Sequence, residues 1–340
     1  MSCVEPLSAV SGAGRRLAVG LVSGGLDSCL AVDVIQKQGF DVIGVFVRTP
    51  FLQRRGQKVL ANVRSMASRQ RFELVIIEAG EEYLALVTSP RFGYGKRLNP
   101  CIDCHIFMLR KAAEVMRDAG AQFVFTGEVL NQRGMSQTYP SLTKVQKESG
   151  LGRWLVRPLS ARLLPVTEPE EEGLLDRERL LAIRGKQRQV QIAEAAARNL
   201  TFFGSPAGGC LLTDAGFSRR LGDLLEQGEP LDLRTCVLLQ TGRHFRVDSR
   251  TRLIVARTPE EESILRENAG PSDLLLCEDS RDVPLALIRG ACSRVCLEVA
   301  AAYGRHANAV ITVRSADGAC VSRHCVPRRE KAAFSRYLIT

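Results

Sequence analysis

The sequence lacks any apolar run close to the roughly 20 residues that a membrane-spanning helix needs, so we expect no membrane partner. Residues 1–16 contain Glu5 and have no apolar h-region, so they do not follow the pattern of a secretory signal. Internal repeats and low-complexity tracts are also missing. These absences predict a cytoplasmic protein of ordinary globular type that begins with a flexible tail, residues 1–16.

Lysine is scarce, because 39 of the 47 basic residues are arginine and only 8 are lysine. The net charge of +10 is concentrated in residues 48–200, which carry 25 basic and 16 acidic residues. A basic region of this kind is able to bind a polyanion such as RNA. Arginine-rich chains also arise from nucleotide composition, so charge alone leaves RNA binding and a solvated surface both open.

Length and cysteine content narrow the class of protein further. A chain of 340 residues suggests about two domains and buries a full core without disulfide bonds. Its 11 cysteines do not form the dense framework of a small secreted protein. In a reducing compartment, clustered cysteines favour metal, cluster or thiol chemistry.

Hydrophobic patterning predicts an α/β protein. Five short apolar runs have the length of strands: 17–22, 41–48, 73–78, 121–126 and 154–159. Helical segments fall at 27–38, 57–70, 103–119 and 168–200. This alternation predicts a doubly wound parallel sheet with right-handed crossovers over residues 17–200.

The pattern changes after Gly204. Short strand-like segments follow at 236–239, 252–257, 274–277, 285–288 and 309–314, with helical stretches at 259–268 and 292–303. We therefore predict a connecting segment, residues 201–235, and a smaller α+β domain, residues 236–340.

A glycine-rich turn follows the first predicted strand and opens the first predicted helix. Its loop, residues 23–28, contains Ser23, Gly24, Gly25, Asp27 and Ser28. Glycines bring backbone N–H groups close to an anion, and the helix N-terminus adds partial positive charge. The loop also lies at the carboxyl end of a strand, where open α/β sheets bind ligands. The Walker pattern G-x-x-x-x-G-K-[ST] is absent, so this is a phosphate loop of another type.

The S-G-G-L-D-S motif resembles the PP-loop ATP pyrophosphatase superfamily, which has the adenine nucleotide alpha-hydrolase-like fold. The resemblance implies that residues 23–28 surround the pyrophosphate of ATP, with Mg²⁺, and that ATP is cleaved between the α- and β-phosphates. It also implies that a carbonyl oxygen is adenylated. The motif alone does not choose among tRNA thiolases, tRNA lysidine synthetase, NAD synthetase and argininosuccinate synthetase.

Three cysteines form the second candidate site. Cys101 and Cys104 are spaced C-x-x-C at the start of a predicted helix, where thiols are expected to have a lowered pKa. Cys210 follows in a Gly-Gly-Cys sequence. Spacing leaves a redox pair, zinc, an iron–sulfur cluster, a persulfide and buried thiols all open, and His105 is poorly placed as a fourth zinc ligand.

A PP-loop together with these cysteines resembles the tRNA thiolases, over about residues 17–225. In the cluster-dependent branch the three cysteines hold a [4Fe-4S] cluster whose unique iron binds the transferred sulfur, and in the persulfide branch one cysteine carries sulfur and another resolves it. The resemblance also implies that Thr126 and Gly127 lie near the nucleotide. Related thiolases have a Thr-Gly-His sequence at this point, whereas this chain has Glu128 in place of the histidine. We expect Glu128 and Asp103 to handle protons or bind Mg²⁺.

The predicted activity is ATP-dependent tRNA sulfur transfer, in which a uridine carbonyl oxygen is adenylated and replaced by sulfur from an unidentified donor. Residues 242–290 resemble, more weakly, the small RNA-binding domain of NFACT-type proteins, which makes Arg243, Arg246, Arg257 and Arg289 candidate phosphate contacts. Two other functions fit the motifs less fully. One is a PP-loop sulfurtransferase or amide-forming ligase acting on a small molecule, and the other is a non-catalytic RNA-binding protein.

Overall fold

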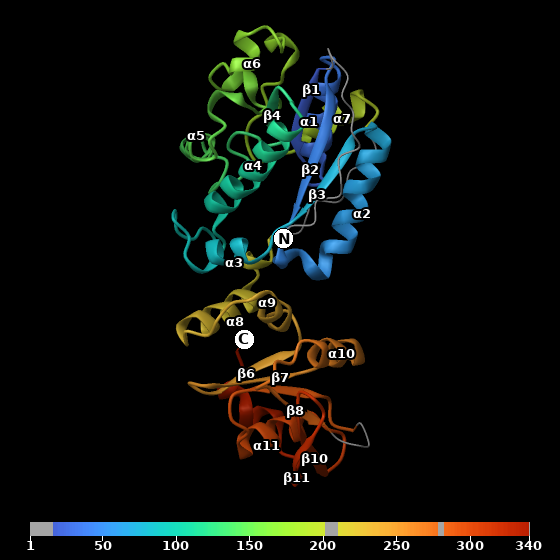
Figure 1. Cartoon of the computed structure of the whole chain (residues 1–340), viewed down its shortest axis with the longest axis vertical. Coiled ribbons are helices and arrows are strands. Elements are labelled where there is room, and N and C mark those ends of the chain that lie inside the picture. The colour runs from blue at the N-terminus through green and yellow to red at the C-terminus, as the bar shows by residue number, and fades with distance from the viewer. Residues whose placement is uncertain (1–15, 201–209, 278–281, 340) are drawn as a thin grey trace. The chain divides into compact units, whose positions relative to one another are not determined.

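A computed structural model describes residues 16–200, 210–277 and 282–339 of the chain, which divides into two units, residues 1–210 and 211–340 (Figure 1). Each unit has a sheet of its own. Apart from Arg16, the predicted tail lies outside the described residues, as do residues 201–209 of the predicted connecting segment. Within these described ranges, no helix combines the length and apolarity needed to cross a membrane.

The first unit contains a parallel sheet with strand order β3-β2-β1-β4-β5. Its strands are β1 (Leu17–Leu21), β2 (Asp41–Arg48), β3 (Glu73–Glu78), β4 (Phe123–Thr126) and β5 (Leu155–Val156). The strands are continuous apolar runs because a parallel sheet is buried on both faces. The predicted α/β parallel sheet is therefore confirmed, with β5 shorter than expected.

Helices cover the two faces of this sheet. They are α1 (Leu26–Gln36), α2 (Gln53–Gln70), α3 (Glu81–Thr88), α4 (Cys101–Asp118), α5 (Tyr139–Glu148), α6 (Glu168–Glu171) and α7 (Gln189–Ala197). Helix α1 packs against α2 and α7, whereas α4 packs against β1, β4 and α3, and Figure 1 shows α2 and α4 on opposite sides of the strands. Loops after β1 and β4 therefore meet at the carboxyl edge, where the strand order reverses direction.

The helical region predicted at 168–200 is only partly helical. It consists of α6, a 3-10 turn at Arg177–Arg179 and α7, with loops between them. Gly173 and Gly185 have φ of +70° and +93°, a left-handed conformation that ends helical geometry. This break brings the segment before α7 back over the sheet edge.

The second unit contains an antiparallel sheet with strand order β11-β10-β8-β9-β7-β6. Its strands are β6 (Arg243–Asp248), β7 (Thr251–Val255), β8 (Leu274–Cys277), β9 (Ala286–Arg289), β10 (Asn308–Ser315) and β11 (Cys320–Pro327). Its helices are α8 (Ala215–Glu226), α9 (Leu233–Leu239), α10 (Pro259–Glu267) and α11 (Arg294–Ala302). The predicted α+β character of this region is confirmed.

One predicted strand of the second unit is a helix. Residues 236–239 were expected to be a strand, but they belong to α9. Asp232 caps this helix by accepting the N–H of Thr235 at 2.6 Å. The periodicity of a short apolar run does not distinguish a buried strand from a buried helix. The capping residue Asp232 is the local signal that favours a helix here.

Candidate functional site

The glycine loop, residues 23–28, lies between β1 and α1 as predicted. Ser23 N–H donates to Ser28 Oγ at 3.3 Å, and Ser28 Oγ donates to the Gly25 carbonyl at 3.0 Å. Gly24 has φ of +71°, which favours glycine at this position. The loop is therefore folded back onto the first turn of α1, and its backbone forms a tight turn at the helix N-terminus.

Gly127 brings the loop after β4 into direct contact with the glycine loop. A Cβ atom added to Gly127 would lie 2.7 Å from the backbone C and O of Asp27 and 2.8 Å from Ser28 N. These distances are shorter than van der Waals contact, so only glycine fits. The structure thus joins two segments that sequence analysis assigned separately to the nucleotide.

Asp27 is held by two side chains from distant parts of the chain. Its Oδ2 accepts from Gln132 Nε2 at 3.1 Å and from Arg188 Nη2 at 3.0 Å. Among the described residues, its Oδ1 is buried with no hydrogen-bond partner, and so is Arg188 Nε. Sequence analysis missed Arg188, because it lies 161 residues from Asp27 and belongs to no motif.

Ser160 explains how Arg188 reaches the glycine loop. This fully buried hydroxyl accepts the N–H of Leu130 at 2.9 Å and donates to the carbonyl of Ile183 at 2.7 Å. Gly185 N–H donates to the Leu130 carbonyl at 2.8 Å. The segment before α7 is therefore fastened to the loop after β4, and Arg188 projects from it toward Asp27.

Glu128 is buried with both carboxylate oxygens engaged. Oε1 accepts from His105 Nδ1 at 2.8 Å, whereas Oε2 accepts from Arg157 Nε at 3.0 Å and from Thr126 Oγ1 at 3.1 Å. Burial alone raises the pKa of Glu128. The positive charge of Arg157 and the hydrogen bond from His105 outweigh it and lower the pKa to about 2.

The predicted roles of Glu128 and Asp103 in handling protons or binding Mg²⁺ stay predictions, and the fold gives both carboxylates internal partners. A carboxylate with a pKa of about 2 is a weak base at neutral pH, and the hydrogen bonds of Glu128 hold the loop after β4 in place. Asp103, also buried, accepts the backbone N–H groups of Arg91 and Phe92 at 3.0 and 3.1 Å. Asp103 therefore anchors the segment that precedes α4.

Cys101 and Cys104 lie in the first turn of α4 but do not have lowered thiol pKa values. Burial raises the pKa of Cys104 to about 12, even though Tyr83 donates its hydroxyl to Cys104 Sγ at 3.1 Å. Burial also raises the pKa of Cys101, against the opposing charge of Arg133. The expectation from the helix N-terminus is wrong here because desolvation outweighs the helix dipole.

Cys210 lies near this pair, at the exposed end of the first unit. Its thiolate charge raises the pKa of both Cys104 and Tyr83, so the three predicted cysteines share one region. Nowhere in the part of the chain that the structure describes are three His, Cys, Asp or Glu side chains arranged to hold a metal ion. The cysteines as placed therefore do not fit a [4Fe-4S] or zinc centre.

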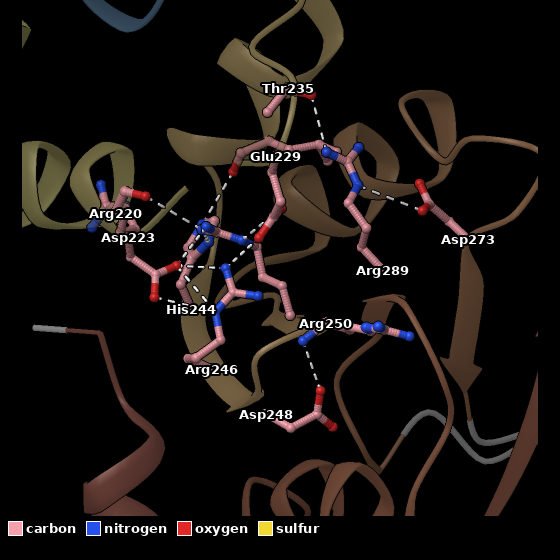
Figure 2. Close-up of polar contacts among 12 residues, drawn as sticks. Arg220, Asp223, Glu229, Thr235, His244, Arg246, Asp248, Arg250, Asp273 and Arg289 are labelled. Atoms are coloured by element: carbon pink, nitrogen blue, oxygen red, sulfur yellow. Dashed lines mark hydrogen bonds and ion pairs between the residues drawn. The ribbon is translucent and has the colours of Figure 1, made fainter. Parts of the chain in front are cut away.

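The predicted phosphate contacts in the second unit point largely inward. Figure 2 shows Arg246 directed at the carboxylates of Asp223 and Glu229, with Arg246 Nη2 2.6 Å from Asp223 Oδ2. Arg289 Nη1 donates to Thr235 Oγ1 at 3.0 Å. The expectation for Arg246 is thus corrected, because two internal carboxylates already neutralise its charge.

The two remaining candidates also have internal partners. Arg257 Nη1 lies 3.8 Å from Glu261 Oε1, and the guanidinium of Arg243 lies 4.8 Å from the centre of the Tyr303 ring. The Arg257 ion pair is partly exposed to solvent, and the Arg243 contact is a cation–π interaction. Both contacts are therefore weaker than the ion pairs of Arg246. Arg243 and Arg257 are the more available of the four predicted phosphate contacts.

Comparison with known families supports both resemblances drawn from the sequence, that of the PP-loop region and that of the C-terminal region. Residues 13–161 match the family described as thiamine biosynthesis protein (ThiI), and they include the glycine loop, Cys101, Cys104 and Glu128. The chain carries a ThiI-like PP-loop domain. This adenine nucleotide alpha-hydrolase domain is related to tRNA thiouridylases. Residues 242–318 match the family described as NFACT protein RNA binding domain, which confirms the second resemblance.

Curated relatives of the PP-loop domain are distant and cover part of the chain. A tRNA-specific 2-thiouridylase MnmA from Nitratiruptor sp. is 26% identical over 35% of this chain and 36% of its own length. A probable tRNA sulfurtransferase from Thermococcus kodakarensis is 29% identical over 42% of this chain and 36% of its own length. The chain thus spans about a third of the length of these relatives.

Two solved structures also align with the chain at low similarity. A 4-thiouridine synthetase in complex with RNA and ATP has 24% identity and a TM-score of 0.33, covering 42% of this chain and 36% of that protein. A predicted subunit of tRNA methyltransferase from Methanocaldococcus jannaschii has 14% identity and a TM-score of 0.31, covering 42% of this chain and 67% of that protein.

Proposed function

We propose that the protein is an ATP-dependent tRNA sulfurtransferase that adenylates a uridine carbonyl oxygen and replaces that oxygen with sulfur. The observation that carries this proposal is the contact between the glycine loop and Gly127, with Asp27 held between Gln132 and Arg188. A tRNA-specific 2-thiouridylase and a probable tRNA sulfurtransferase are among the proteins that align with this domain. The NFACT RNA-binding domain supports an RNA substrate rather than a small molecule.

The glycine loop and its neighbours suit the first half of the reaction. The uridine oxygen attacks the α-phosphorus of ATP, and pyrophosphate leaves toward the N-terminus of α1, where backbone N–H groups offset its charge. Arg188 lies beside the loop with a buried N–H that has no partner among the described residues. The unpartnered Asp27 Oδ1 suits Mg²⁺, a cation that prefers oxygen ligands and neutralises phosphate charge.

The cysteines suit the second half, in which sulfur displaces AMP from the adenylated base. Because the described residues do not form a three-ligand metal site, we assign the sulfur to a cysteine persulfide. Cys210 is the exposed member of the three and is the candidate carrier, loaded as a persulfide by a sulfane-sulfur donor. The outer sulfur attacks the adenylated carbon and displaces AMP, which leaves a disulfide between the base sulfur and Cys210. Cys101 or Cys104 then attacks Cys210 Sγ, which releases the thiolated base and forms a disulfide between the two cysteines. A dithiol reductant then restores the thiols.

Asp27→Ala is expected to lower tRNA-dependent release of pyrophosphate from ATP on the order of 100-fold, because one preorganised charged group of the site is lost. Asp118→Ala is the matched control, since Asp118 is an exposed carboxylate at the last residue of α4. Pyrophosphate is measured with bulk tRNA from a strain that lacks the protein. Equal rates for Asp27→Ala and the unsubstituted protein would contradict the nucleotide site.

Cys210→Ala is expected to abolish formation of thiolated uridine while leaving tRNA-dependent pyrophosphate release within a few-fold of normal. Adenylation and sulfur transfer are separate steps, so a sulfur carrier affects only the second. Cys292→Ala is the control, because Cys292 lies in the second unit. Nucleosides are analysed by mass spectrometry, and the anaerobically purified protein is assayed for persulfide, zinc and iron. About four iron atoms per chain, lost on replacing Cys101, would refute the persulfide assignment.

A further inference from the structure

We propose that the surface around Cys101 binds a single-stranded segment of the RNA substrate, with bases stacked on two tyrosines and phosphates on the basic side chains beside them. This inference rests on the proposed function and assigns the place where the RNA is held. We call the region the cysteine-side surface. It consists of Tyr94, Lys96, Arg133, Met135, Tyr139 and Lys144, all of them exposed.

The cysteine-side surface comes from two segments that lack acidic residues. Residues 89–102 and 129–147 together contain six Lys or Arg residues and no Asp or Glu. Two carboxylates adjoin these segments: Glu148 pairs with Arg91 at 2.7 Å, and the buried Asp103 accepts backbone N–H groups. The charges of Lys96, Arg133 and Lys144 have no acidic neighbour within their own segments, so the local field is positive and attracts a polyanion.

Several contacts bring the two segments together beside the thiol. A Cβ atom added to Gly95 would lie 3.7 Å from Cys101 Sγ and 3.6 Å from Met135 Cε. Lys144 Nζ lies 5.1 Å from the centre of the Phe92 ring. The segment before α4 and the segment after β4 therefore adjoin each other next to Cys101. An RNA segment bound there passes Cys101, one of the two candidate resolving cysteines.

Large apolar side chains are exposed on the same two segments. Tyr94 is 37% exposed, Tyr139 49% and Met135 56%, whereas Tyr83 and Met66 of the same unit are buried. Aromatic faces beside lysine and arginine are the combination that binds single-stranded nucleic acid, because bases stack and phosphates pair with cations. In a duplex the base faces are covered by their neighbours, so this surface favours unpaired nucleotides.

The segment that carries Tyr94 is held in place by hydrogen bonds within the protein. Tyr94 donates its hydroxyl to the Val87 carbonyl at 2.7 Å, and Gly95 N–H donates to the Asn99 carbonyl at 2.8 Å. Asp103 holds the start of the same segment. A preorganised surface loses less conformational entropy when it binds, so modest contacts give useful affinity.

The test measures binding of the full-length protein to a labelled single-stranded RNA of about a dozen nucleotides and to its blunt duplex. The triple substitution Lys96→Gln, Arg133→Gln, Lys144→Gln is expected to lower single-strand affinity at least ten-fold and to reduce the salt slope by about 2, or about 0.7 for each lost phosphate contact. A matched control, Lys58→Gln, Arg64→Gln, Arg71→Gln, removes the same charge from exposed positions on α2 and its C-terminal end.

Two tyrosine substitutions test stacking without changing charge. Tyr139→Ala is expected to weaken single-strand binding about ten-fold and duplex binding little, whereas Tyr139→Phe keeps the ring and restores affinity. Ultraviolet crosslinking of a 5-bromouridine RNA is expected to label peptides that contain Tyr94 or Tyr139. Mapping by mass spectrometry separates this surface from the NFACT RNA-binding domain, which contributes its own affinity.

The outcomes distinguish this inference from the proposed function. If the unsubstituted protein binds RNA and the cysteine-side variants behave like the α2 control, the surface assignment is overturned and the RNA substrate stands. Crosslinks confined to the second unit would overturn it equally. If the unsubstituted protein binds neither RNA, the proposed tRNA substrate itself fails.

Discussion

Replacing Gly127 with alanine is expected to weaken Mg²⁺-ATP binding by about 100-fold, the loss that a displacement of about 1 Å causes in a preorganised site. The new Cβ atom would lie 2.7 Å from the Asp27 backbone C and O, where van der Waals contact requires more than 3 Å. Both neighbours are backbone atoms, so no side-chain rotation relieves the clash. The loop after β4 or the glycine loop has to move.

Gly134→Ala is the matched control for this experiment. Gly134 lies in the same loop, but a Cβ atom there would meet no atom within 4 Å and its φ is not left-handed. Binding is measured by calorimetry, and fluorescence of the single tryptophan, Trp154 in the first unit, checks that the variant is folded. If Gly127→Ala bound ATP as Gly134→Ala does, ATP would not bind at the junction of these loops.

The parts of the site that could be predicted are contiguous in the sequence. A strand, a glycine loop and a helix follow each other within residues 17–36, so local patterning placed the loop correctly. The partners of the loop could not be predicted in this way. Arg188 reaches Asp27 across 161 residues, and Arg157 reaches Glu128 across 29, because the sheet edge brings several loops together.

Residue chemistry was harder to predict than position, because burial decides it. The position of Cys101 and Cys104 at a helix start was correct, but burial raised the thiol pKa values that the helix was expected to lower. Glu128, which stands in place of a histidine, was expected to handle protons or bind Mg²⁺. In the fold this carboxylate neutralises a buried arginine, a role that appears only when Arg157 is placed beside it.

Glu128→Gln is expected to destabilise the first unit by about 3–5 kcal/mol, because it leaves the charge of Arg157 buried without a counterion. The guanidinium is 3% exposed in its side chain and the carboxylate 7%, so water cannot replace the lost partner. Unfolding in urea is followed by Trp154 fluorescence, which reports on this unit alone. Glu78→Gln is the control: Glu78 also pairs with an arginine at 3.0 Å but is 47% exposed, and we expect a loss below about 1 kcal/mol.

The same pair predicts how stability depends on pH. The folded-state pKa of Glu128 is about 2, below its ordinary value of 4.5, so its ionised form stabilises the fold fully above about pH 4.5. That stabilisation, about 3 kcal/mol, is lost as the pH falls from 4.5 toward 2. Glu128→Gln has no such group, so the difference in unfolding free energy between it and the unsubstituted protein is expected to shrink across this window. A difference that stayed constant from pH 7 to the acid limit would show that the carboxylate is not ionised against Arg157 in the fold.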